Sequence, residues 1–243
     1  MRNVIVTGAS RGLGLAMARK LAQSGDHVVA VARSPSPELE RAALAAGEAG
    51  GAVSFVAADL AAIDAIPELV RRIRKEFGPP FGLVNNAGVS REGLLATMHN
   101  SEIEAVVRLN TVSPMVMTKY VVRAMMAEGA GRIVNVSSII GSTGYNGLAV
   151  YGATKASMIG FTKSLAREVG RVGITVNALA PGFMETELTG GLAEEDRRRI
   201  AGRSALRRLA EVEDAANAVA FLLSDAARNI TGTVLTVDAG NTA

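Results

Sequence analysis

The sequence predicts a single α/β domain over residues 1–243, with a doubly wound, seven-stranded, mostly parallel sheet and helices on both faces. Short β-branched runs alternate with longer segments of helical periodicity, an order that implies right-handed crossovers between parallel strands. The strand-like runs are apolar throughout, as burial on both faces requires. No Pro/Ser-rich linker, internal repeat or low-complexity tract divides the chain, so one domain is the simplest organisation.

The first half of the chain contains four predicted strands and three predicted helices. Leu13, Met17 and Leu21 recur at helical spacing, and Gly25 ends the first of these helices. The strands are expected at 4–7, 28–32, 53–57 and 82–84, and the helices at 13–24, 38–46 and 63–77.

The second half continues the alternation with longer helices. Strands are expected at 132–136, 175–180 and 233–237, and helices at 101–127, 150–172 and 212–223. The 150–172 helix carries Ala156, Met158 and Phe161 on more than one face. A helix that is apolar on several faces must be buried on more than its sheet side, so this pattern predicts a helix-mediated dimer at minimum.

The connection at 182–211 is long for a compact domain, in which about 2–6 residues usually join a strand to a helix. We expect it to form a lid over the active site, although an ordinary surface excursion would have the same length. Its arginines, from Arg197 to Arg208, suit a solvated helix face beside Glu194 and Glu195. They equally suit a patch for an anionic substrate or an acidic partner.

Composition excludes several classes of function. The 26 basic residues are nearly balanced by 23 acidic ones and aromatic residues make up 4%, so no stacking basic stripe marks a nucleic-acid binder. The absence of cysteine excludes disulfides, thiolate metal sites and a cysteine nucleophile. His27 and His99 have no partner pattern for a metal, and no metal is expected. No targeting segment or membrane-spanning run is recognised, so the protein is predicted to be cytoplasmic.

A glycine-rich turn at residues 7–14 joins the first predicted strand to the first predicted helix, with the spacing G-x-x-x-G-x-G. Glycines let a ligand approach the backbone, and a helix N-terminus offers N–H groups to a pyrophosphate. A Rossmann-type dinucleotide site is therefore predicted here. Its candidate contacts are Gly8, Ser10, Arg11, Gly12, Leu13 and Gly14.

The choice between the two nicotinamide dinucleotides depends on the end of the second strand. An NAD-binding domain places an acidic residue there for the ribose 2′-hydroxyl, but this chain has Arg33. Arg33 and Arg11 present two guanidinium groups, which bind phosphate strongly. NADP(H) is therefore the predicted cofactor, and the alternative interpretation of Arg33 is a solvated residue at a strand end.

Tyr151 and Lys155 stand four residues apart at the start of a predicted helix, which places them on one face. A free phenol has a pKa near ~10, too high for ready proton exchange at neutral pH. A nearby ammonium and an oxidised nicotinamide, both cationic, would lower that pKa. Ser138 adds a hydroxyl at the end of the fifth strand, at the sheet edge where open α/β sheets bind ligands.

Taken in order, these motifs resemble the short-chain dehydrogenase/reductase family over essentially the whole chain. The matching motifs are the loop 7–14, Asp59-Leu60, Asn85-Asn86-Ala87-Gly88, Asn110, Ser138, Tyr151-x-x-x-Lys155 and Pro181-Gly182. Within the family, the bacterial 3-oxoacyl-acyl-carrier-protein reductases are the most similar, through residues 91–95, 161–168, 173–177 and 180–183.

The resemblance implies a role for each matched residue. Tyr151 would donate a proton to a carbonyl oxygen, and Ser138 would orient that oxygen. Lys155 would lower the Tyr151 pKa and hold the nicotinamide ribose. Asn110 would bend the long helix and hold a water that links Lys155 to solvent. The further cofactor contacts that the resemblance implies are Asp59, Leu60, Asn86, Ala87, Gly88, Pro181, Gly182 and Thr186.

The chain departs from these reductases at two places. Where they present basic residues to an acidic carrier, it has Gly129 and Val172, and Arg132, Arg171 or the 197–208 arginines would have to substitute. Residues 238–243 replace the usual glycine pair and apolar tail.

The predicted activity is NADPH-dependent reduction of a 3-oxoacyl thioester, carried by acyl carrier protein or CoA, in a protein that the resemblance implies is a homotetramer. The alternatives are a reductase or dehydrogenase of another small ketone, alcohol or sugar, and a non-catalytic dinucleotide sensor. An intact set of Asn110, Ser138, Tyr151 and Lys155 argues against the sensor.

Overall fold

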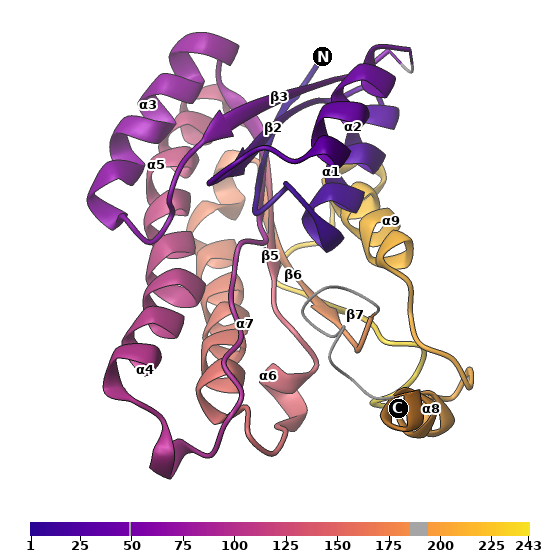
Figure 1. Cartoon of the computed structure of the whole chain (residues 1–243). Helices are drawn as coiled ribbons and strands as arrows, with labels where there is room; N and C mark the ends of the chain where they lie inside the picture. Colours follow the sequence, from indigo (N-terminus) through magenta and orange to yellow (C-terminus); the bar gives the residue numbers. More distant parts are fainter. Residues whose placement is uncertain (49, 185–193) are drawn as a thin grey trace.

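The fold was obtained as a computed structural model that describes residues 1–48, 50–184 and 194–243. Seven strands form one sheet in the order β3-β2-β1-β4-β5-β6-β7, and every pair of neighbours is parallel (Figure 1). The order runs outward in both directions from the β1–β4 junction, so the sheet is doubly wound as predicted. The strands are β1 Asn3–Thr7, β2 His27–Ala32, β3 Ala52–Ala57, β4 Pro80–Asn85, β5 Gly131–Val136, β6 Ile174–Pro181 and β7 Val234–Val237.

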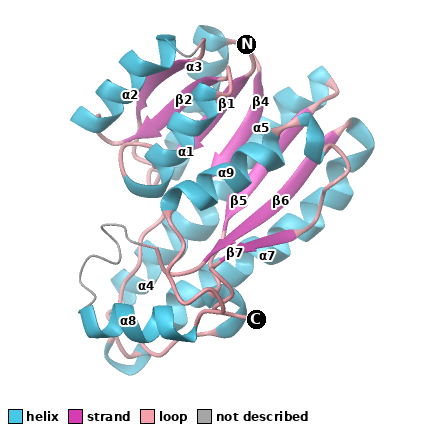
Figure 2. Ribbon diagram, turned by 90° about the vertical axis from the view of Figure 1, so that its right-hand side faces the viewer, coloured by secondary structure: helices cyan, strands magenta, loops and turns pink. Residues whose placement is uncertain are grey.

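Helices cover both faces of the sheet, which gives three layers (Figure 2). One face packs against α1 Gly12–Gln23, α2 Pro37–Glu48 and α9 Val212–Leu223. The other packs against α3 Ile66–Phe77, α5 Ser113–Glu128 and α7 Ala149–Val169. Successive residues of β1 serve the two cores in turn, because Val4 and Val6 face the first set of helices and Ile5 faces the second. This arrangement explains why the strands read as continuous apolar runs.

The prediction of one continuous helix over 101–127 is wrong, because the structure has two α-helices separated by a π-helix. Residues 100–107 form α4 (Asn100–Val107), a five-residue π-helix occupies Arg108–Val112, and α5 then begins at Ser113. Pro114 has no N–H to donate to the carbonyl of Asn110, so the regular ladder fails at this point. The Asn110 side chain bonds instead to the backbone of Val89, which fixes the widened turn.

Other element ends differ by a few residues from the predictions. The predicted helix at 150–172 ends at Val169 and continues as a 3₁₀ turn over Gly170–Val172. The predicted helix at 63–77 begins with a 3₁₀ turn, Ile63–Ala65, before α3. A short helix, α6 Ile140–Thr143, was not predicted because one turn is too short to show a period.

The long connection between β6 and α9 is described only in part, and residues 185–193, with the predicted contact Thr186, lie outside the described residues. Its described portion contains α8 Glu194–Arg203. Met184 and Ala210 form an isolated parallel bridge near its two ends. Among the described residues, no helix is both long and apolar enough to cross a membrane.

Candidate active site

The glycine-rich loop lies between β1 and α1, as predicted, and its backbone requires glycine. Gly8 and Gly12 have φ of +66° and +53°, in the left-handed region that disfavours other residues. A Cβ on Gly14 would lie 2.2 Å from the carbonyl oxygen of Gly8, so the first turn of α1 packs directly on the loop. Arg11 is the N-cap residue of α1 and makes no side-chain cap, so the helix N-terminus is built to receive a ligand's acceptors.

Asn86 ties the end of β4 to this loop. Its amide donates to the carbonyls of Thr7 at 2.9 Å and Gly8 at 3.3 Å. The Thr7 hydroxyl in turn accepts the backbone N–H groups of Asn86 and Ala87 at 2.9 and 3.0 Å. The structure therefore brings the 86–88 motif and the glycine loop together, although they are far apart in the sequence.

Three more of the predicted cofactor contacts, Arg33, Asp59 and Leu60, lie just beyond the carboxyl ends of β2 and β3. Arg33 is exposed just beyond β2, and Arg11 is exposed in the loop. Ser36 donates to the carbonyl of Ser10 at 2.5 Å, which holds the segment after Arg33 against the loop. At the end of β3, the Asp59 carboxylate accepts the N–H of Ala61 at 3.0 Å and Leu60 is buried.

Tyr151 and Lys155 lie on one face of the first turns of α7, as their spacing predicts. The Lys155 Nζ is 5.6 Å from the centroid of the Tyr151 ring and donates to the carbonyl of Val136 at 2.8 Å. Lys155 is only 6% exposed, and burial lowers the pKa of its ammonium from 10.5 to about 8. The lysine charge is therefore held beside the phenol at the end of β5.

The surroundings of Tyr151 in the protein act on the pKa of its phenol in two opposite ways. Burial raises the pKa of the phenol, and a side-chain hydrogen bond with Ser138 opposes this effect. Desolvation outweighs the effect of Ser138 because the half-buried ring packs against the apolar side chains of Ile139, Ile140 and Leu148. Burial in this apolar cluster therefore disfavours the phenolate form of Tyr151.

The two adjacent serines after β5 have different roles. The Ser137 hydroxyl donates to the carbonyl of Lys155 at 2.7 Å, so it anchors α7 to the sheet. The Ser138 hydroxyl accepts the N–H of Ile140 at 3.2 Å, and its influence on Tyr151 lowers the pKa of that phenol. Ser138 is therefore the serine nearer to the Tyr151 phenol.

Asn110 lies in the π-helix and is buried. Its carbonyl oxygen accepts the N–H of Val89 at 2.9 Å, and its amide donates to the Val89 carbonyl at 2.8 Å. The amide also reaches the Thr154 hydroxyl at 3.2 Å. Asn110 thus joins the loop segment after Gly88 to the helix of Tyr151 and Lys155.

Thr154 and Asn135 support the site but were not predicted as part of it, and Asn85 was named only as the first residue of the 85–88 motif. Asn85 and Asn135 pair at the ends of β4 and β5, where the Asn85 amide donates to the Asn135 carbonyl oxygen at 2.8 Å. The Asn135 amide then donates to Thr162 of α7 at 2.8 Å. The available signal was an amide in each of two apolar strands, since buried amides need partners.

Pro181 and Gly182 lie at the carboxyl end of β6, beside Ser138. The Pro181 carbonyl accepts the N–H of Ile139 at 3.0 Å, and Gly182 donates to Val237 at 2.9 Å. Phe183 then packs in the same small apolar cluster as Tyr151. The long connection therefore leaves the sheet beside the cluster that contains the Tyr151 ring.

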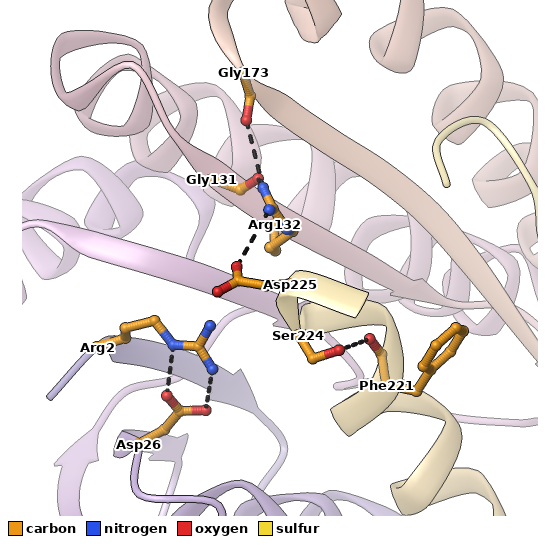
Figure 3. Close-up of polar contacts among 8 residues, drawn as sticks. All are labelled: Arg2, Asp26, Gly131, Arg132, Gly173, Phe221, Ser224 and Asp225. Carbon is orange, nitrogen blue, oxygen red and sulfur yellow. Dashed lines mark hydrogen bonds and ion pairs between the residues drawn. The ribbon is translucent and has the colours of Figure 1, made fainter. Parts of the chain in front are cut away.

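Two of the arginines predicted to bind an acidic carrier protein, Arg132 and Arg171, differ in their exposure to solvent. Arg132 is 8% exposed and turned into the opposite edge of the sheet, where it donates to Gly131 at 2.9 Å and Gly173 at 3.4 Å (Figure 3). Its guanidinium lies 3.8 Å from the exposed carboxylate of Asp225. Arg132 therefore cannot present a free charge to a partner, whereas Arg171 is exposed.

A dinucleotide-type loop and a Ser–Tyr–Lys set at the same edge of a parallel sheet define an oxidoreductase that moves a hydride and a proton at a carbonyl or hydroxyl group. Within the described residues, no cluster of three potential ligands could hold a metal ion. The chain belongs to the short-chain dehydrogenase family, whose model matches residues 2–197.

Relatives cover nearly the whole chain. It is 43% identical over 240 residues to the 3-oxoacyl-[acyl-carrier-protein] reductase FabG of Escherichia coli K12, which is 97% of this chain and 95% of that protein. The FabG of Pseudomonas aeruginosa is 40% identical with the same coverage. A crystal structure of a proposed NAD(P)-dependent gluconate 5-dehydrogenase from Beutenbergia cavernae, with NADP at low occupancy, matches with a TM-score of 0.92. It is 34% identical and covers 99% of this chain and 96% of that one.

Proposed function

We propose that this protein reduces a 3-oxoacyl thioester to the 3-hydroxyacyl thioester with NADPH. The observation that carries the reaction type is the placing of Ser138, Tyr151 and buried Lys155 together at the carboxyl edge of the sheet, with the Lys155 Nζ 5.6 Å from the centroid of the Tyr151 ring. The substrate class is supported by the 3-oxoacyl-acyl-carrier-protein reductases, which are 43% and 40% identical over nearly the full length.

The residues present fit NADP(H). A Cβ on Gly12 would meet no atom within 4 Å, so the space over the N-terminus of α1 is open to a pyrophosphate. Arg11 and Arg33 would bind the 2′-phosphate, and Asp59 and Leu60 would flank the adenine. The structural neighbour from Beutenbergia cavernae contains NADP. When bound, the cofactor supplies the hydride for the carbonyl carbon.

The remaining steps belong to the side chains of this chain. The Ser138 hydroxyl would hold the substrate's carbonyl oxygen, and Tyr151 would give that oxygen its proton as the carbon is reduced. Lys155 would stabilise the phenolate left on Tyr151 and hold the nicotinamide ribose. Asn110 would hold Tyr151 and Lys155 in position through its hydrogen bonds to Val89 and Thr154.

The second candidate is a dehydrogenase of a small sugar acid or polyol. It is favoured by the 0.92 TM-score to a proposed gluconate 5-dehydrogenase. The fold is common to both relatives, and the choice of substrate depends on the side chains that line the pocket.

Substrate assays separate the two candidates. NADPH consumption would be followed with acetoacetyl-CoA, with the same acyl group on acyl carrier protein, and with 5-ketogluconate. We expect turnover of the thioesters and little of the sugar acid. Turnover of 5-ketogluconate alone, by protein that binds NADPH, would contradict the proposed substrate.

Replacement of Arg33 by aspartate is expected to reverse the cofactor preference. The variant loses the guanidinium that would pair with the 2′-phosphate of NADPH. The new aspartate can instead accept a hydrogen bond from the ribose 2′-hydroxyl of NADH. The ratio of kcat/KM for NADPH to that for NADH should fall by roughly a hundredfold. Arg41→Asp, an exposed arginine on α2, is the control. An unchanged ratio would show that Arg33 is only solvated.

We also propose that the protein works in the cytoplasm as a homotetramer, with a dimer as its minimal form. Val112 and Met126 on the outer side of the α4–α5 region are 39% and 47% exposed. Phe161 on the neighbouring α7 is half-buried. Apolar side chains on these adjacent helices are suited to cover the same helices of a second copy.

A further inference from the structure

The last turn of the chain, residues 238–242, folds around a single carboxylate. Asp238 follows β7 and is 9% exposed. Its Oδ1 accepts the N–H of Gly240 at 2.9 Å, and its Oδ2 accepts the N–H and hydroxyl of Thr242 at 2.9 and 2.7 Å. Ala239 and Gly240 both have positive φ, of 55° and 77°. A left-handed alanine is unfavourable, so these contacts must hold the turn in this shape.

This turn holds the end of α8. The amide of Asn241 donates to the carbonyl of Ile200 at 3.4 Å and to the hydroxyl of Ser204 at 3.3 Å. The last carbonyls of a helix lack partners within the helix, so the Asn241 amide satisfies one of them. Ile200 is itself buried, and α8 lies beside the C-terminus (Figures 1 and 2).

Backbone hydrogen bonds extend the contact beyond the helix. Ala205 donates to the carbonyl of Gly240 at 3.2 Å, and Leu206 donates to that of Ala239 at 3.0 Å. A Cβ on Gly240 would lie 2.6 Å from the Cβ of Ala205, so the two segments are in close contact.

The same turn also contacts the catalytic edge of the sheet. A Cβ on Gly182 would lie 2.6 Å from the Cβ of Asp238. The next residue, Phe183, packs in the apolar cluster that contains Tyr151. One short segment therefore links α8 to the point where the long connection leaves the site.

We propose that residues 238–242 are a positioning element that fixes α8 at the substrate side of the active site. Asp238 shapes the turn, and Asn241 is the positioning residue that holds α8. The proposal rests on the proposed function, because it assigns α8 to the thioester side of the site. It predicts that loosening the turn weakens the use of the thioester while the binding of NADPH is kept.

Asn241→Asp is the sharpest test, because it keeps the size of the side chain and removes its N–H donors. The matched control is Asn229→Asp, at an exposed asparagine in the turn before β7. Loss of two hydrogen bonds should speed hydrogen exchange of a peptide containing Ala205 and Leu206 by about tenfold, with α1 unchanged. The KM for acetoacetyl-CoA should rise by about tenfold, with the NADPH Kd within about twofold.

The second variant is Gly240→Ala, which forces a side chain against Ala205 and should give the same pattern. Unchanged exchange at 205–206 in both variants would overturn the proposal. Equal losses in substrate KM and NADPH affinity would overturn it too, because they would indicate a general structural effect. If the wild type does not reduce acetoacetyl-CoA, the proposed function fails, while the exchange comparison still decides whether the turn holds α8.

Discussion

Tyr151→Phe is expected to lower turnover by roughly a thousandfold, the amount that a well-placed general acid contributes. Phenylalanine keeps the ring that packs with Ile139 and Leu148, so the fold and the pocket should be retained. The variant loses only the phenol hydroxyl, the group that would give its proton to the substrate. Single-turnover reduction of acetoacetyl-CoA, started from enzyme saturated with NADPH, measures this step directly.

The affinity for NADPH should stay within about twofold in the same variant, because aromatic packing is retained and only a hydroxyl is removed. Fluorescence titration of the cofactor tests this expectation. Tyr120→Phe is the matched control, since that ring lies on α5 with Lys119 and Arg123 each 5.4 Å from its centroid. A Tyr151→Phe protein that turns over like Tyr120→Phe would refute proton donation by Tyr151.

The sheet could be predicted because its signal is local. Burial on both faces makes each strand an apolar run, and the parallel order then collects their carboxyl ends at one edge. The glycine loop, Asn86 and Ser138 meet there for that reason alone. Strand ends were less predictable, as in β4, which begins at Pro80 because Pro80 pairs with Asn3. That pairing is set by a partner far away in the sequence.

The interruption of the long helix could not be derived from periodicity. The turn at Arg108–Val112 depends on bonds between Asn110 and Val89, which only the folded chain brings together. Pro114 was a local signal for a break, although a proline in a first helical turn is also compatible with a new helix. The bend at Asn110 was indicated by the resemblance to a family and not by the apolar pattern.

The direction of the Tyr151 pKa shift was equally beyond sequence reasoning. Spacing places the Lys155 cation near the phenol but gives no measure of how deeply either group is buried. In the folded protein, desolvation raises the pKa of Tyr151 and lowers that of Lys155, so burial opposes ionisation of both groups. The site thus holds a charged lysine at a cost to the stability of the fold.

Lys155→Met is accordingly expected to stabilise the protein while it removes most of the activity. A pKa lowered from 10.5 to about 8 means that below pH 8 the folded state carries a desolvated ammonium. The desolvated ammonium lowers the free energy of unfolding of the wild type by roughly 3 kcal/mol. Methionine removes this destabilisation but also loses the hydrogen bond to Val136, which is worth about 1 kcal/mol. The free energy of unfolding at pH 7 should therefore rise by about 1–3 kcal/mol. Turnover should fall by roughly a thousandfold, because the phenolate loses its cation.

The stability gained by Lys155→Met is expected to depend on pH, because the wild type titrates at Lys155 and the variant does not. Between pH 8 and 10.5 the unfolded wild type binds more protons at Lys155 than the folded protein does, so the wild type gains stability as pH rises through this window. The stability difference between Lys155→Met and wild type should thus shrink from pH 7 to pH 9.5. Urea unfolding at both pH values, at matched protein concentration, measures it. Lys163→Met, at an exposed lysine of the same helix, should show no such trend. A Lys155→Met protein less stable than wild type at pH 7 would mean that the buried ammonium is fully compensated by its surroundings.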